Sequence, residues 1–122
     1  AFKTPTDPRW SDSRDVQEFH DFLKQWYPKG DIADGSNVTG YITAYMTVKV
    51  LEMCGNDLTR ENLLKQATSL DKVVAPLLLP GISISTRPDR YAPFTQMQVA
   101  TFDGKSWVPQ GEIFNTDAAA GR

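Results

Sequence analysis

Histidine and cysteine are almost absent from this sequence of 122 residues, which contains one of each, His20 and Cys54. A single cysteine excludes a disulfide framework and a thiolate metal cluster. A single histidine with no carboxylate or cysteine at ligand spacing favours a structural role. The segment "GSNVTG" (residues 35–40) lacks the lysine of a phosphate-binding loop and matches no dinucleotide fingerprint. The sequence therefore predicts no metal site, no cofactor and no enzyme active site built on a nucleophile and its base.

Long runs of one kind of residue are also missing. The net charge is −2, and lysine and arginine are scattered, so nothing predicts binding to nucleic acid or to an anionic membrane. The apolar stretch "VVAPLLLPGI" is broken by Pro76 and Pro80 and is far shorter than the roughly 20 residues of a membrane helix. With 40 % apolar and 23 % charged residues, the composition is that of one soluble globular domain.

Apolar residues at helical spacing predict three helices in the first seventy residues. The first spans about Ser13 to Tyr27 and ends before Pro28, and the second runs from Ser36 or Asn37 to Cys54. The second helix is apolar almost all round, which predicts burial among several neighbours. The third begins after Thr59, its expected N-cap. The apolar stripe of the first helix consists of Val16, Phe19, Leu23 and Trp26.

After residue 80 the pattern changes to that of strands. "GISIST" (81–86) alternates, and so does "TQMQVATF" (95–102). The sequence "DGKS" (103–106) predicts a hairpin turn, with a return strand over 107–114 that Pro109 restricts to an edge or shortens. Residues 115–122 have the composition of a frayed tail.

The segment "GDIADGSNVTGYITAY" (30–45) admits three interpretations: a calcium loop, a glycan acceptor, or the start of a helix that faces a ligand. Asp31, Asp34 and Asn37 are spaced by three, and no acid follows before Glu52, which disfavours a calcium loop. The triplet "NVT" matches the glycan acceptor pattern at Asn37, but such triplets are common by chance.

The order of segments along the chain resembles a known family. "WYPKGD" is followed by "NVTGYITAYMTVKVLEMCGNDLTRENLLKQATSL" and then by "VVAPLLLPGISISTRPDRYAPFTQMQVATFDGKSWVPQGEIF". "GNDLTREN" and "FDGKSWVPQG" at this separation are the most specific parts. The chain resembles the C-terminal third of the periplasmic solute-binding proteins of branched-chain-amino-acid ABC transporters, and the resemblance covers nearly its whole length.

The resemblance implies an α/β fold that is part of a type I periplasmic binding protein, with three helices followed by a short antiparallel strand pair. Residues 1–122 would be the C-terminal segment of a two-lobed, discontinuous receptor and not a complete folding unit. The family captures a small carboxylate-bearing solute, a branched-chain amino acid or an aromatic acid, and delivers it to an ABC transporter permease. It works in the periplasm, carries no cofactor and catalyses no reaction.

In the family, an aromatic residue near the start of the corresponding helix contacts the solute. That likeness makes Tyr41 a ligand-binding residue, with Asn37 and Gly40 beside it at the mouth of the helix. The alternative from the residues alone is that Asn37 caps the helix and Tyr41 packs against neighbours. The solute-anchoring loops of the family lie outside this sequence, so the solute itself is not predicted.

Two other classes of protein remain open at this point: a ligand-sensing receptor domain with the same fold, and an unrelated small enzyme. The second helix is apolar on more sides than its neighbours in this chain can cover, and the strands have open edges. Both features predict that the chain forms a symmetric homodimer.

Overall fold

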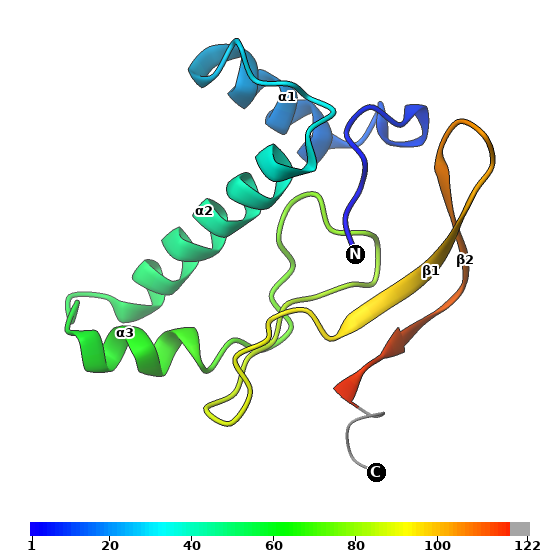
Figure 1. The fold of residues 1–122 in the computed structure, drawn as a ribbon. Helices are drawn as coiled ribbons and strands as arrows, with labels where there is room; N and C mark the ends of the chain where they lie inside the picture. The colour runs from blue at the N-terminus through cyan, green and yellow to red at the C-terminus, as the bar shows by residue number, and fades with distance from the viewer. Residues whose placement is uncertain (118–122) are drawn as a thin grey trace.

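The computed structural model describes residues 1–117, which fold into three α-helices followed by a two-stranded antiparallel sheet (Figure 1). The helices are α1 (Arg14–Trp26), α2 (Gly35–Cys54) and α3 (Arg60–Ala67), and the strands are β1 (Gln96–Phe102) and β2 (Trp107–Asn115). The predicted mixture of three helices and a strand pair is confirmed. Within residues 1–117, no helix has both the length and the apolar character that crossing a membrane requires.

Helix α1 is amphipathic, and it buries the stripe that its spacing predicts. Val16, Phe19 and Leu23 are at most 5 % exposed, whereas Trp26 is 69 % exposed and lies outside the core. Pro28 follows the last turn, where the amide of Tyr27 still donates to the carbonyl of Leu23.

Helix α2 is less buried than its apolar circumference predicts. Its buried side chains are Val38, Ile42, Val50 and Cys54. Helix α1 lies at its N-terminal end and α3 folds back beside its C-terminal end (Figure 1). The buried side chains of α2 form one core cluster with side chains of the segment between α3 and β1. Val48 is 53 % exposed and Leu51 is 42 % exposed. The described residues therefore cover only part of the apolar circumference of α2.

The segment between α3 and β1 forms the centre of the molecule without regular structure (Figure 1). The predicted strand at 81–86 is wrong, since only an isolated bridge joins Ile84 to Val73. Burial does alternate along this segment, because Ile82 and Ile84 are each 1 % exposed while Ser83 and Ser85, which follow them, are partly exposed. The central segment contributes to the core Leu70, Ala75, Leu77, Leu78, Ile82 and Ile84.

The first residues of the chain pair with this central segment. The amide of Lys3 donates to the carbonyl of Leu77 at 2.8 Å, and the amide of Leu79 donates to the carbonyl of Ala1 at 2.9 Å. The ammonium of Lys3 lies 2.9 and 2.8 Å from the two carboxylate oxygens of Asp15 in α1. Asp15 Oδ2 also accepts the amide of Leu77 at 2.8 Å. One carboxylate thus joins the N-terminal segment, α1 and the centre.

The hairpin contains the turn that the sequence predicts. Asp103 Oδ1 accepts the amides of Lys105 and Ser106, while Gly104 has φ 98°, a conformation that favours glycine. Pro109 pairs with Ala100, and both strands of this two-stranded sheet are edges. Of the predicted tail, Asn115 belongs to β2, and residues 118–122 lie outside the described part.

Candidate functional site

The three predicted ligand-binding residues line one depression between α1 and the first turns of α2. Asn37, Gly40 and Tyr41 come from α2, and its volume is about 270 Å³. The opposite side is formed by α1 and the residue after it, with Phe22, Leu23 and Tyr27. Gly40 leaves the α2 side open, because a Cβ atom added there would meet no atom within 4 Å. The structure therefore brings the predicted residues together in a concave, largely apolar surface.

Tyr41 is held by aromatic contacts with α1. Its ring centroid lies 5.2 Å from that of Phe19 and 5.1 Å from that of Phe22, both edge-to-face. Burial raises the pKa of the Tyr41 hydroxyl above 10.0, and the negative charges of Glu18 and Asp15 act in the same direction. The phenol is thus protonated at neutral pH and can donate a hydrogen bond. Packing and ligand contact are both compatible with this position.

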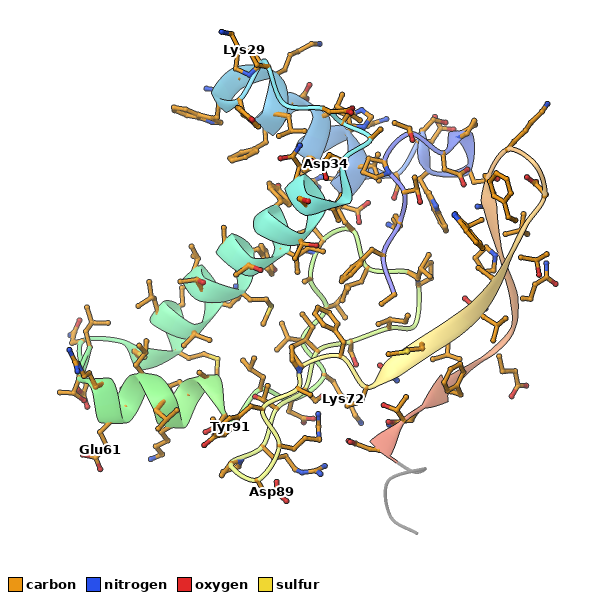
Figure 2. All side chains as sticks on the ribbon, viewed as in Figure 1. Lys29, Asp34, Glu61, Lys72, Asp89 and Tyr91 are labelled. Carbon is orange, nitrogen blue, oxygen red and sulfur yellow. The ribbon has the colours of Figure 1, made fainter. Side chains whose placement is uncertain are left out.

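Asn37 does not cap α2, contrary to one of the two interpretations from sequence. The N-cap is Asp34, whose Oδ1 accepts the amide of Ser36 at 2.8 Å. That hydrogen bond holds the pKa of Asp34 below its ordinary value of 3.8. The side-chain amide of Asn37 instead donates to the carbonyl of Asp31 at 2.8 Å. Asp34, labelled in Figure 2 at the start of α2, therefore places a negative charge at the N-terminus of the helix.

The acidic residues ahead of α2 have local roles. Asp31 Oδ1 accepts the amide of Ala33 at 2.8 Å, so it stabilises the turn into the helix. Among residues 1–117, no three histidine, cysteine, aspartate or glutamate side chains gather as metal ligands do.

His20 and Cys54 also occupy structural positions. His20 Nε2 lies 3.1 Å from the carbonyl oxygen of Pro5, which fixes the N-terminal segment against α1. Cys54 is 6 % exposed at the end of α2 and packs in the core. The two side chains belong to separate contacts, as expected from the sequence.

A second concavity was not predicted. It has a volume of about 600 Å³ and is lined by residues of the segments 69–72, 81–90, 95–96 and 115–117, here called the polar basin. Its charged side chains include Lys72, Arg87, Arg90 and Asp117. These residues are far apart in sequence and form no motif, so only the folded chain reveals them.

Comparisons of this chain with protein families, with curated proteins and with solved structures found no match. The likeness to periplasmic solute-binding proteins therefore remains a prediction from the sequence.

Proposed function

We propose that this chain is the C-terminal part of an extracytoplasmic solute-binding receptor that captures a small carboxylate-bearing solute and passes it to an ABC-type permease. The order of segments that resembles the family supports this. The main structural support for this proposal is that Asn37, Gly40 and Tyr41 line one depression between α1 and α2. A partial type I binding-protein fold also agrees with helices and a hairpin whose apolar faces have no partner among residues 1–117.

The depression supplies one aromatic wall of a binding site. With about 270 Å³, it is smaller than the roughly 300–1,000 Å³ of an ordinary ligand pocket, so a second wall from the rest of the receptor would complete it. Tyr41 and Tyr27 would contact the apolar part of the solute, and the protonated Tyr41 hydroxyl would donate to a polar group. The carboxylate of Asp34 would repel that of the solute, which would accordingly be held by the other lobe.

The test uses the complete receptor and separates binding from packing. Tyr41→Phe keeps the ring contacts with Phe19 and Phe22 and removes only the hydroxyl. If Tyr41 binds solute, this variant should lose about 0.5–1.5 kcal/mol of binding free energy, the net value of one hydrogen bond, without a change in the melting temperature of the unliganded protein. Tyr41→Ala should lose about 1–3 kcal/mol of binding free energy.

Tyr45→Phe is the matched control, because Tyr45 lies one turn further along α2 and does not line the depression. Calorimetric titration with leucine, valine and benzoate gives the affinities. Unchanged affinity in both Tyr41 variants, with a lower melting temperature for Tyr41→Ala, would show that Tyr41 only packs.

A further inference from the structure

We propose that the polar basin binds a small oxyanion, a molecule that carries a carboxylate or phosphate group. The basin is lined in part by the first residue of β1 and the last residue of β2, whereas the Tyr41 depression is lined by residues of α1 and α2. Figure 1 shows where these elements lie. This second site is independent of the proposed receptor function. It is inferred from a surplus of hydrogen-bond donors that have no acceptor among the described residues.

Lys72 is the first of these donors. Its ammonium makes no hydrogen bond and no ion pair within residues 1–117, although its backbone amide donates to Ser85 Oγ at 2.9 Å. Its φ is 48°, in the left-handed region that residues with a side chain seldom adopt. Glycine would adopt this backbone conformation without strain. A lysine at this position, beside a cavity, therefore suggests that its side chain has a function there.

Gln96 supplies the second donor, because its side-chain amide has a fixed orientation. Its Oε1 accepts both the amide of Ser83 at 2.9 Å and the hydroxyl of Ser83 at 3.1 Å. The NH₂ end therefore has no partner within residues 1–117 and lines the basin.

Two guanidinium groups share one carboxylate at the other side of the basin. Asp117 Oδ2 lies 3.1 Å from Arg90 Nε and 3.7 Å from Arg87 Nη1. Arg90 Nε is buried and is not aligned for a hydrogen bond, while Nη1 of the same side chain donates to the carbonyls of Ser85 and Ala92. Arg87 Nε also donates to Asp89 Oδ1 at 3.2 Å, so two carboxylates face the two guanidinium groups. The N–H groups that these contacts do not use remain for a ligand.

Two hydroxyl oxygens of the basin already accept hydrogen bonds. Ser85 Oγ accepts the amide of Lys72, and Thr86 Oγ1 accepts the amide of Leu70. Asp71 is an exposed carboxylate of the lining, and together with Asp89 and Asp117 it balances the charges of the three cations. The basin is therefore distinguished by its unused donors and not by a net charge. The lining offers polar and apolar surface in similar amounts, and the volume of about 600 Å³ is that of a metabolite site. A small, polar ligand with acceptor oxygens fits these properties best.

The test is an NMR titration of the 122-residue chain with inorganic phosphate and, separately, with succinate, at constant ionic strength set by chloride. Binding predicts saturable shifts of the Gln96 side-chain NH₂ signals and of the Lys72 and Ser85 amides. Lys72→Met should weaken the affinity about tenfold, the scale of one charge-assisted hydrogen bond. Gln96→Glu should abolish binding, because it replaces a donor with a negative charge.

Matched controls place the same changes elsewhere. Lys29→Met removes a lysine at the opposite end of the molecule, as the labels in Figure 2 show, and Gln110→Glu adds a charge on exposed β2; both should bind normally. Lys72→Gly relieves the positive φ and should fold at least as stably as the parent while losing the same affinity. Linear shifts without saturation, or equal affinity in Lys72→Met and the parent, would overturn the proposal.

Discussion

At the scale of the residue, Asp15 has the most connections across the chain. Burial acts to raise its pKa, but hydrogen bonds from Lys3 and Ser13 outweigh that effect and hold the pKa below 3.8. The same carboxylate accepts the amide of Leu77, a residue with φ 63°, and so fixes an unfavourable backbone conformation in the core. Removing its charge therefore affects three segments at once.

Asp15→Asn should lower the free energy of unfolding by about 1–3 kcal/mol, the range for hydrogen bonds to a charged group. The lowered pKa means that this stabilisation is fully present above the unfolded-state value near 3.8 and is lost as the pH falls through the folded-state pKa. Urea unfolding at neutral pH and across the acid range measures both effects. The difference between parent and variant should shrink below about pH 4.

Asp12→Asn is the control, because Asp12 is exposed just before α1 and makes no ion pair within residues 1–117. A variant of Asp15 as stable as the Asp12 variant, or a difference that persists at the lowest pH, would contradict this role.

At the scale of the element, features that depend on neighbours in sequence were predicted better than features that depend on tertiary contacts. Helix α3 begins after Thr59, whose hydroxyl accepts the amide of Asn62, as the sequence indicates. The hairpin turn at Asp103 and Gly104 was equally readable, because its geometry depends on neighbours in sequence. The strand predicted at 81–86 failed since a strand requires a partner, and Val73 offers only one bridge. The polar basin could not be predicted either, because its lining residues are far apart in sequence and meet only in the folded chain.

The start of α2 shows how one residue can decide a helix end. Asp34→Ala should lower the melting temperature, because the Ser36 amide loses its cap, whereas Asp34→Asn should retain most of it, since asparagine caps equally well. Thermal unfolding followed by circular dichroism compares the two. Asn37→Ala should have the smaller effect of the two alanine variants, and the reverse order would restore Asn37 as the capping residue.

At the scale of the whole molecule, apolar side chains remain in solvent on two separate surfaces. On α2, Val48 and Leu51 are exposed, and on the hairpin Met97 and Val99 are 44 % and 58 % exposed. The alternation of β1 therefore places Gln96, Gln98 and Ala100 on the more buried face. A soluble monomer seldom carries such surfaces.

We expect the chain to associate with itself, as a symmetric dimer, through these surfaces and the open strand edges. Light scattering at micromolar concentration should give a mass above the 13.6 kDa of the monomer. Leu51→Glu should shift the equilibrium toward monomer if α2 is in the interface, and Thr43→Glu adds the same charge at another exposed site of α2. A compact, cooperatively folding monomer in the parent would contradict the expectation.

The incomplete Tyr41 depression also predicts that the 122-residue chain binds leucine or benzoate weakly. Tight sites bury most of a ligand between two walls, and only one wall is formed here. Calorimetry should detect no sub-micromolar binding. Any weak binding through the polar basin would be recognised by its loss in Lys72→Met, while sub-micromolar binding that survives this change would refute the prediction.

The pairing of residues 1–3 with residues 77–79 constrains the order of events during folding. All three helices lie between the paired segments, so α2 and α3 can meet through local contacts long before the N-terminal segment finds its place. Closing so long a loop adds little equilibrium cost, about 0.6 kcal/mol for each doubling of its length, but it delays the contact. Residues 1–3 must therefore stay unpaired until the central segment reaches them, and the backbone amides of Lys3 and Leu79 should be among the last to become protected from hydrogen exchange.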